Sequence, residues 1–312
     1  MKTNSGKVGL LFGLAAFLAI GGPFLLGRAG NESYAVPEPT VLSEADAQFV
    51  DKQTLSFCKK DSTTAVSEPT MSAALTNQEV PVILYHRITK ADKPSHEVTR
   101  PALFREQMDW LKAEGYETIS AAHLHDYMNS KRTIPKKPIV ITFDDGWKDN
   151  LEAAKYLAKL NLGATFYIVS GFFTAPQYIN QPELKELVKN PKFEIGSHSH
   201  SHFVKYDDMS KVSLCTFAKE LSVSKLILER IIEKPVTSFA WPYGFTTKQA
   251  VFAAEAIGYT NTMHVNRDSH NAPGHSVLYI RRMNIDGNCN LDDFKKMIET
   301  NTLKECSPAS SR

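Results

Sequence analysis

Two adjacent carboxylates at the end of an apolar run are the residues of this chain best suited to chemistry. Asp144 and Asp145 follow the run 138–143, and Gly146 comes directly after them. β-Branched and aromatic residues favour a buried strand over this run, and the glycine marks a turn that ends it. The carboxyl ends of parallel strands are where ligands bind in α/β sheets. An acidic loop that caps a helix beginning near Asp149 is the alternative explanation.

A second cluster follows further along the chain, where His198, His200 and His202 alternate with serines. Neutral imidazole is the commonest metal ligand, and a carboxylate often completes such a site. Asp145 with two of these histidines would leave a coordination position open for water. A metal lowers the pKa of its bound water, and a neighbouring carboxylate such as Asp144 can take the proton. The alternative is a solvated loop or a nonspecific metal-binding tract.

A third segment, Trp241-Pro242-Tyr243-Gly244, ends another apolar strand with turn residues. An exposed Trp241 and Tyr243 beside this turn would make a platform for the apolar face of a sugar ring. Backbone N–H groups of the turn could meet a developing oxyanion. Taken alone, the segment is better explained as a core aromatic pair with a tight turn.

Together these segments resemble the NodB-type polysaccharide deacetylases of carbohydrate esterase family 4, over residues 80–286. Thr142-Phe143-Asp144-Asp145-Gly146 is similar to their first motif and His198-Ser199-His200-Ser201-His202 to their second, while Trp241-Pro242-Tyr243 matches the third in part. The resemblance implies that Asp144 is the catalytic base and that Asp145, His198 and His202 hold the metal. It makes His200 a neighbour of the ligands.

One departure from that family concerns the third motif, which in most members begins with an arginine that orients the base. This chain has Phe239-Ala240-Trp241 there, and nothing in 262–282 clearly matches the late motifs. The chain is more similar to the poly-β-1,6-N-acetylglucosamine deacetylases, a branch with a circularly permuted barrel, in which a strand ending in Tyr-His precedes the Asp-Asp motif. Tyr85-His86 is such an ending. The first and last strands of a closed sheet are neighbours, so we expect His86 to be the general acid. A histidine hydrogen-bonded to the barrel rim is the alternative.

Length and composition allow one sizeable α/β core with appendages, since the chain has 312 residues of which 42% are hydrophobic. Apolar strands alternate with segments of helical period, which predicts a mainly parallel sheet. The resemblance makes this sheet a distorted (β/α) barrel. Strands are predicted at 81–86, 139–143, 163–169, 193–196, 237–241 and 278–285, and helices near 102–114, 149–160, 182–189, 210–232 and 247–257.

The amino-terminal region has the shape of an export signal, because Lys2 and Lys7 precede an almost uncharged stretch over 8–26. The stretch is nearly long enough for a retained membrane anchor, and Ser33-Tyr34-Ala35 offers a cleavage site. We therefore expect an extracytoplasmic protein. The predicted divisions are a signal peptide or anchor over 1–35, a flexible linker over 36–79, the deacetylase domain over 80–300 and a tail over 301–312.

Four cysteines, at positions 58, 215, 289 and 306, lack the spacing of a zinc knuckle. In an exported chain they can pair in three ways. Cys58 could tie the linker to the barrel, and Cys289 lies near enough to Cys306 to close a loop in the tail.

These observations predict a metal-dependent hydrolase, with zinc favoured, that removes N-acetyl groups from poly-N-acetylglucosamine, peptidoglycan or a chitin-like polymer. A net charge of +2 with dispersed basic residues gives no argument for nucleic acid as a partner. Two other hypotheses are a carbohydrate-binding protein on a barrel that has lost turnover, and a hydrolase acting on an amide that is not part of a sugar.

Overall fold

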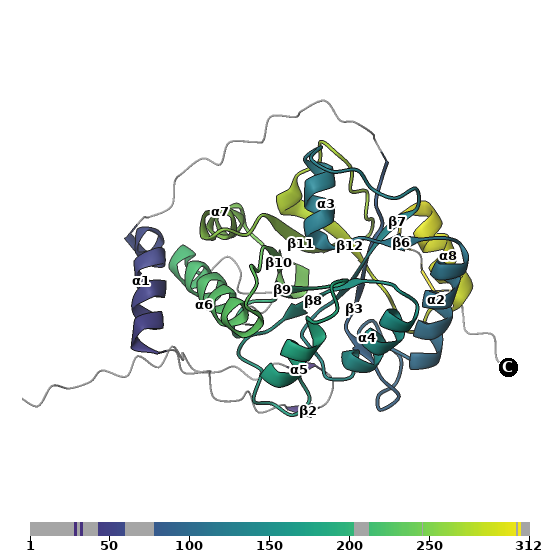
Figure 1. The fold of residues 1–312 in the computed structure, drawn as a ribbon, viewed down its shortest axis with the longest axis horizontal. Helices are drawn as coiled ribbons and strands as arrows, with labels where there is room; N and C mark the ends of the chain where they lie inside the picture. The colour runs from purple at the N-terminus through teal and green to yellow at the C-terminus, as the bar shows by residue number, and fades with distance from the viewer. Residues whose placement is uncertain are drawn as a thin grey trace, which may run out of the picture.

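The computed structural model describes residues 28–29, 32–33, 43–59, 78–202, 212–244, 246–303 and 305–306. Within them, seven parallel strands close into a barrel, because the first of these strands, β3, pairs with both β12 and β7 (Figure 1). In the order in which they pair around the barrel, the strands are β3 (Val82–Tyr85), β12 (Ile280–Asn284), β11 (Asn261–Asn266), β10 (Ser238–Ala240), β9 (Phe193–Ser197), β8 (Ala164–Ile168) and β7 (Pro138–Phe143). The predicted fold class is confirmed.

Short strands lie outside this ring. β6 (Glu117–Thr118) pairs in parallel with the start of β7. β4 (Arg87–Ile88) pairs in parallel with β5 (Val98–Thr99), and β1 (Arg28–Ala29) pairs with β2 (Glu32–Ser33).

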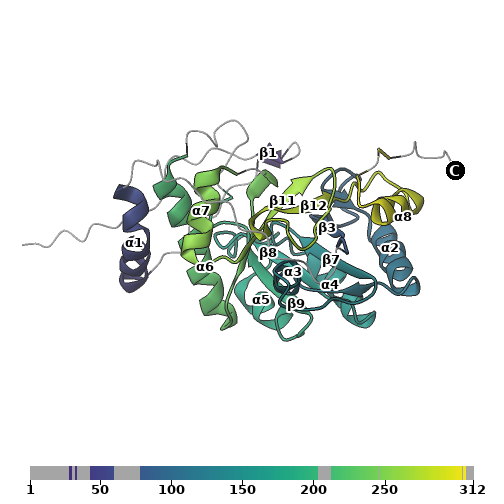
Figure 2. The same ribbon diagram turned by 90° about the horizontal axis from the view of Figure 1, so that it is seen from above.

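Helices cover the outside of the barrel in the order expected of βα units (Figures 1 and 2). They are α2 (Pro101–Ala113), α3 (Ala121–Met128), α4 (Asn150–Lys159), α5 (Gln181–Leu187), α6 (Leu214–Ile232), α7 (Lys248–Ile257) and α8 (Leu291–Thr300), with short 3-10 turns η2 (Pro242–Gly244) and η3 (Val277–Tyr279). α3 is the exception to the outer position, because its Leu124 and Tyr127 pack with residues of the barrel interior.

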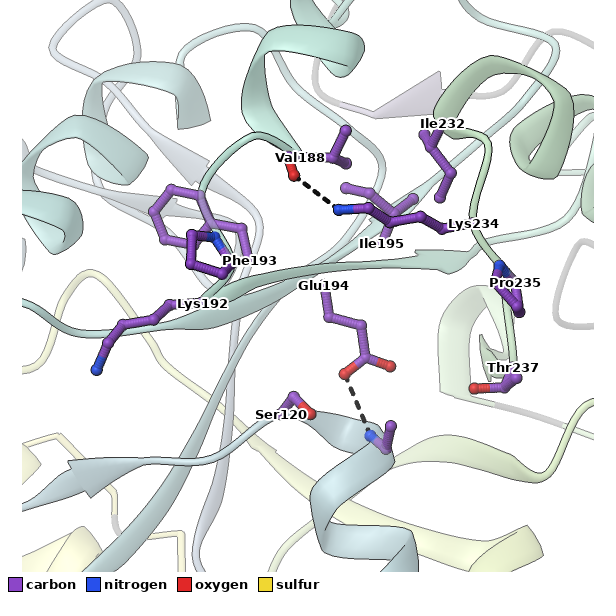
Figure 3. A pocket seen from close by; sticks show the side chains of 12 residues that line it. Ser120, Val188, Lys192, Phe193, Glu194, Ile195, Ile232, Lys234, Pro235 and Thr237 are labelled. Atoms are coloured by element: carbon purple, nitrogen blue, oxygen red, sulfur yellow. Dashed lines mark hydrogen bonds between the residues drawn. The ribbon is translucent and has the colours of Figure 1, made fainter.

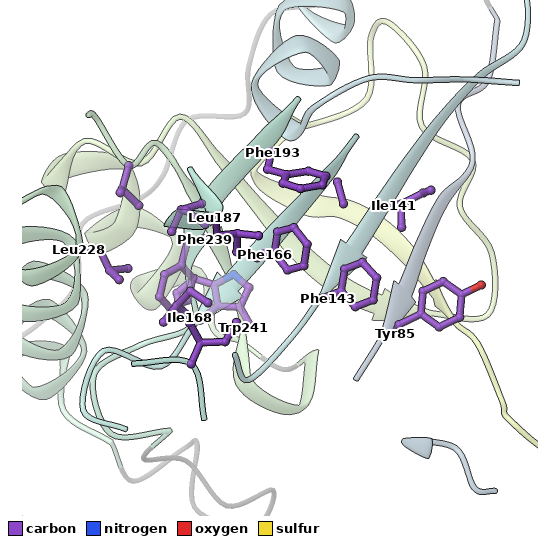
Figure 4. Packing of buried hydrophobic residues seen from close by; sticks show 14 of the residues in the cluster. Tyr85, Ile141, Phe143, Phe166, Ile168, Leu187, Phe193, Leu228, Phe239 and Trp241 are labelled. Carbon is purple, nitrogen blue, oxygen red and sulfur yellow. The ribbon is translucent and has the colours of Figure 1, made fainter. Parts of the chain in front are cut away.

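Alternation of side chains along each strand divides the core into two layers. Ile141 and Phe143 of β7 belong to the layer between the strands and the helices, where Phe143 stacks on Phe166 of β8 (Figure 4). Val140, on the opposite face of β7, packs with Tyr167 and with inward residues of other strands. Because Asp144 continues the inward series of β7, its carboxylate lies in the barrel lumen.

Residues 44–59 form a helix, α1 (Glu44–Lys59), that packs along α6 through Val50 and Phe57. The disulfide Cys58–Cys215 joins the two helices, and Cys289–Cys306 closes the carboxy-terminal loop. The expectation of a flexible linker over 36–79 is therefore wrong for 44–59, where apolar residues at helical spacing bury one face. Both cysteine pairings that the sequence left open are present.

The predicted export segment over 8–26 lies outside the described residues, as do Tyr34 and Ala35 of the cleavage motif. Among the helices that the structure describes, none combines the length and the apolar character needed to cross a bilayer.

Candidate active site

Asp144 and His86 are placed side by side by the pairing of their strands. In the parallel register of β3 and β7, Tyr85 lies opposite Phe143, so the next residue of each strand continues at the same level. The backbone N–H of Asp144 donates to the carbonyl oxygen of Tyr85 at 3.0 Å. Two segments far apart in the sequence therefore bring a carboxylate and an imidazole to the carboxyl end of the barrel.

Asp145, His198 and His202 converge on one point beside Asp144. Asp145 Oδ1 lies 3.3 Å from His198 Nε2 and 3.4 Å from His202 Nε2. One ligand atom from each residue falls within 4.8 Å of the others. His198 Nδ1–H donates to the carbonyl oxygen of Ala240 at 2.8 Å, which leaves Nε2 as its coordinating atom. Two imidazoles and one carboxylate fit a divalent metal that keeps open positions.

His200 lies apart from this set. Its Nδ1 is 2.9 Å from the hydroxyl oxygen of Ser170, and its carbonyl oxygen accepts from the backbone N–H of Gly171 at 2.8 Å. The side chain is buried next to the end of β8. These contacts give His200 a place in the packing of the loop.

Glu220 of α6 fastens the histidine loop to the barrel wall. Its carboxylate accepts the backbone N–H groups of His200 and Ser201, each at 2.9 Å, and the Ser201 hydroxyl at 2.8 Å. Within the loop, the Ser199 hydroxyl oxygen accepts the backbone N–H of His202 at 3.0 Å. These bonds fix the separation of His198 and His202.

Backbone strain is concentrated at this end of the barrel. Asp145 has φ 70°, Ser199 φ 67°, His202 φ 51° and Tyr243 φ 60°, all in the left-handed region. Such conformations cost a non-glycine residue roughly 1–2 kcal/mol and often mark sites where function fixes the backbone. The strained residues follow three different strands, which all end here.

Arg282 of β12 holds Asp144 in place, a contact that the sequence did not predict. Its two terminal nitrogens each lie 2.7 Å from one carboxylate oxygen of Asp144, and Nη1 also donates to the Thr142 hydroxyl at 3.2 Å. Burial is the largest single influence on Asp144 and raises its pKa, but the charge and hydrogen bonds of Arg282, together with the charge of His198, outweigh burial and lower the pKa below its ordinary value. Arg282 thus makes the contact that the resemblance assigns to the arginine absent before Trp241.

His198 and His202 have pKa values shifted in opposite directions, although both side chains face Asp145. Burial disfavours the imidazolium of His198, but Asp144 and Asp145 together raise its pKa above the ordinary value. For His202, burial prevails over the attraction of Asp145 and lowers the pKa. The difference follows from position, because His198 has Asp144 Oδ2 at 3.9 Å as a second carboxylate. A proton on His198 therefore competes with a metal up to a higher pH than a proton on His202 does.

His86 has no hydrogen-bond partner for its buried Nδ1, which does not fit a histidine bonded to the rim through that atom. A positive charge on His86 helps to lower the pKa of both Asp144 and Asp145, which indicates that His86 lies close to the two carboxylates. The later histidines lie elsewhere. His264 is on the face of β11 opposite the inward Met263, and His270 pairs with Glu79, which precedes β3.

The expectation that Trp241 is exposed is wrong. Its ring is 2% exposed and packs edge-on against Phe239 at 4.7 Å in the outer layer of the core, and Pro242 is buried as well (Figure 4). Strand alternation turns Trp241 outward because Ala240 faces inward. Tyr243 alone keeps the expected exposure, at 47%, and its ring centroid lies 4.9 Å from that of His202.

A cavity of about 340 Å³ opens at the opposite end of the barrel, between the starts of β9 and β10 (Figure 3). Glu194 in its wall accepts the backbone N–H of Ala122 at 3.1 Å and so caps α3. Lys234 at its edge donates to the carbonyl oxygen of Val188. None of the predicted site residues lines this cavity.

Comparison with known proteins agrees with this geometry. Residues 131–262 match the family model of polysaccharide deacetylases. The chain is 22% identical over 250 residues to YxkH of Bacillus subtilis, a provisionally assigned polysaccharide deacetylase, covering 79% of this chain and 83% of the relative. It is 23% identical over 248 residues to the poly-β-1,6-N-acetyl-D-glucosamine N-deacetylase of Escherichia coli K12, covering 67% of this chain and 36% of that protein.

Among solved structures, BC0361, a polysaccharide deacetylase from Bacillus cereus, superposes with a TM-score of 0.61 at 28% identity. The superposition covers 71% of this chain and 69% of the other. The matched family segment holds Asp144, Asp145, His198 and His202 and includes strands β7, β8, β9 and β10 of the barrel. The segment over residues 131–262, which holds these four residues, therefore belongs to the polysaccharide deacetylase family, NodB type, carbohydrate esterase family 4.

Proposed function

We propose that this domain is a metal-dependent hydrolase that removes N-acetyl groups from an amino-sugar polysaccharide outside the cytoplasm. The observation that carries the proposal is the convergence of Asp145, His198 and His202 beside Asp144, whose carboxylate is held by Arg282. A metal-ligand set next to a fixed, ionised carboxylate suits the hydrolysis of an amide by water.

A divalent metal held by Asp145, His198 and His202, with zinc favoured by this donor set, would supply a Lewis acid for the amide carbonyl and a water of lowered pKa. Geometry and availability decide between zinc and its neighbours in the series.

In this mechanism Asp144 is the general base. Its lowered pKa keeps the carboxylate ionised at neutral pH, ready to accept the proton of the attacking water. Arg282 fills both carboxylate oxygens with hydrogen bonds and so prevents Asp144 from turning toward the metal ligands. The two neighbouring acids thereby acquire different roles, proton acceptor for Asp144 and ligand for Asp145.

His86, level with Asp144 on the adjacent strand, is the proposed general acid that protonates the leaving amine. Tyr243 lies beside the proposed metal ligands, with its ring centroid 4.9 Å from that of His202. Pro242 has no N–H and the N–H of Gly244 donates to the Trp241 carbonyl oxygen, so the N–H of Tyr243 is the donor of this turn that remains to meet an oxyanion. The exposed ring of Tyr243 is a surface for the apolar face of a pyranose.

Poly-β-1,6-N-acetylglucosamine is the first substrate to test, because the Escherichia coli relative is named as a deacetylase of this polymer and the Tyr-His strand ending resembles that branch. Peptidoglycan and chitin-like chains are the other candidates. Two disulfides support an oxidising, extracytoplasmic compartment. Attachment to the membrane through the segment 8–26 remains part of the proposal.

The experiment is to incubate metal-reconstituted protein with poly-β-1,6-N-acetylglucosamine, chitin oligomers and peptidoglycan, and to measure released acetate and new free amines. Equal amounts of both products from one polymer would support the proposal. Binding of a polymer with no acetate from any of the three would favour a carbohydrate-binding protein. Hydrolysis of simple acetamides alone would favour an amide that is not part of a sugar.

A further inference from the structure

The two carboxylate oxygens of Asp145 face different partners. Oδ1 points to His198 Nε2 and His202 Nε2, whereas Oδ2 accepts a hydrogen bond from the indole N–H of Trp147 at 2.9 Å. A carboxylate whose second oxygen is occupied by a donor has one oxygen to give to a cation. The hydrogen bond also fixes the plane of the carboxylate relative to the two imidazoles.

Trp147 is well placed to impose this orientation because its ring is itself held. The indole is 6% exposed, stacks on Tyr178 with centroids 4.5 Å apart, and has the guanidinium carbon of Arg87 4.6 Å from its centroid. Arg87 in turn pairs with Asp149 at 3.0 Å. The backbone N–H of Lys148 donates to the carbonyl oxygen of Gln177 at 2.9 Å, which fixes the chain beside the ring.

The turn between strand and helix brings the indole back over Asp145. Asp145 and Gly146 are consecutive residues with positive φ, at 70° and 74°. This reversal lets a side chain only two residues later reach Oδ2. Arg87 directly follows His86, so the same contact ties the strand of the proposed acid to the proposed metal ligand.

We propose that Trp147 is a positioning residue that makes Asp145 a one-oxygen ligand, and that Arg87 and Tyr178 hold its indole for this purpose. The proposal rests on the metal-binding role of Asp145 in the proposed function. A metal held here would then receive one oxygen from Asp145, which would leave room for water and the substrate carbonyl. Partners of metal ligands commonly control affinity in this way.

The test is Trp147→Phe, which removes the N–H and keeps an aromatic ring between Arg87 and Tyr178. Trp110→Phe is the matched control. Trp110 lies on α2, where it packs against Tyr116 and Phe294 in the outer layer of the core. Zinc affinity of the metal-free proteins is measured by calorimetry. Trp147→Phe should bind zinc about 10–100-fold more weakly than the native protein, and Trp110→Phe should bind it equally well.

Cobalt supplies a readout that a general loss of stability does not move. The visible spectrum of Co²⁺ should change in Trp147→Phe, because the freed Oδ2 can bind and raise the coordination number, and should stay native in Trp110→Phe. Native zinc affinity together with a native cobalt spectrum in Trp147→Phe would overturn the proposal. If the native protein itself binds no zinc, the metal-dependent function fails instead, which separates the two failures.

Should circular dichroism show Trp147→Phe to be unfolded, Arg87→Met decides. This variant keeps the indole N–H and removes the cation beside the ring, so it should weaken zinc binding by a smaller factor than loss of the bond itself. Unchanged zinc affinity and an unchanged cobalt spectrum in Arg87→Met would contradict the proposal.

Discussion

Arg282 donates hydrogen bonds of 2.7 Å to both carboxylate oxygens of Asp144 inside the barrel. The side chain of Arg282 is 0% exposed and that of Asp144 is 3% exposed. The pair joins β12 to the end of β7 across β3, which lies between them in the sheet. Because a buried ion pair is costly to break, this contact can be tested by stability as well as by activity.

Replacing Arg282 should leave a buried carboxylate without its counter-charge. Arg282→Gln is expected to lose about 3–5 kcal/mol of unfolding free energy at neutral pH, measured by urea unfolding of the metal-free protein. Arg281→Gln is the control, since its exposed pair with Asp268 should contribute less than about 1 kcal/mol. Equal losses in both variants would contradict a special role for the buried pair.

The pH dependence of that stability has a defined sign. The pKa of Asp144 is lowered in the folded protein, so its contribution is present above the unfolded-state pKa of about 3.9 and is lost as pH falls through the lower folded pKa. In Arg282→Gln we expect burial to raise the Asp144 pKa above its unfolded value, so the contribution of Asp144 should be present below about 3.9 and be lost as pH rises through the folded pKa. Asp144→Asn in the same background should remove this dependence.

The proposed ligands Asp145, His198 and His202 predict that replacing the three neighbouring histidines one at a time will have unequal effects on metal binding. His198→Ala and His202→Ala should each lose metal on dialysis, whereas His200→Ala should keep it, because His200 turns toward Ser170. Metal content is read by atomic spectroscopy. Affinity should also fall as pH drops through the raised pKa of His198, since its proton competes with the metal. Equal metal loss in all three variants would make His200 a ligand.

How much of this could be foreseen from the sequence depended on the range of each contact. The strand-ending motifs placed Asp144, Asp145, His198 and His202 because each motif is local and strand ends meet at one edge of a parallel sheet. Arg282 was missed because its contact with Asp144 spans 138 residues and exists only once the barrel closes. A strand over 278–285 was predicted, but two adjacent arginines do not tell which one faces inward.

Other differences have simpler causes. No strand was predicted at β11. Its polar residues Asn261, Thr262 and His264 fall on both the inward and the outward face, so the segment lacks an apolar strand pattern. The exposure of Trp241 was wrong although its strand was right, because the alternation that buries Phe239 also buries Trp241 two residues later. α8 was missed despite Phe294, Met297 and Ile298 at helical spacing, a signal that was present in the sequence.

Loss of His86 should separate proton donation from positioning. His86→Ala should retain metal and substrate binding but cut amide hydrolysis by roughly 10²–10⁴-fold, with a milder defect on an activated ester whose leaving group needs no proton. His96→Ala, at an 82% exposed side chain, is the control. Similar losses on amide and ester would favour positioning, and near-native amide hydrolysis would remove His86 from the site.

Tyr243 should act on polymer binding without affecting the metal. Tyr243→Ala is expected to raise KM for the glycan by roughly 2–10-fold, the value of one aromatic contact of about 0.5–1.5 kcal/mol, with native metal content. Tyr279→Ala is matched to it, since Tyr279 is also exposed, at 43%, but stacks on His264 outside the lumen. A raised KM in both variants, or in neither, would contradict a sugar-binding role for Tyr243.

The most direct measurement is acetate release from poly-β-1,6-N-acetylglucosamine by one preparation in three states: as purified, stripped by chelator, and reloaded with zinc or cobalt. Release should disappear on stripping and return on reloading, while Asp144→Asn binds the metal yet turns over roughly 10²–10⁴-fold more slowly. Undiminished acetate release by the stripped protein would contradict the metal-dependent mechanism, and unimpaired release by reloaded Asp144→Asn would contradict the role of Asp144 as base.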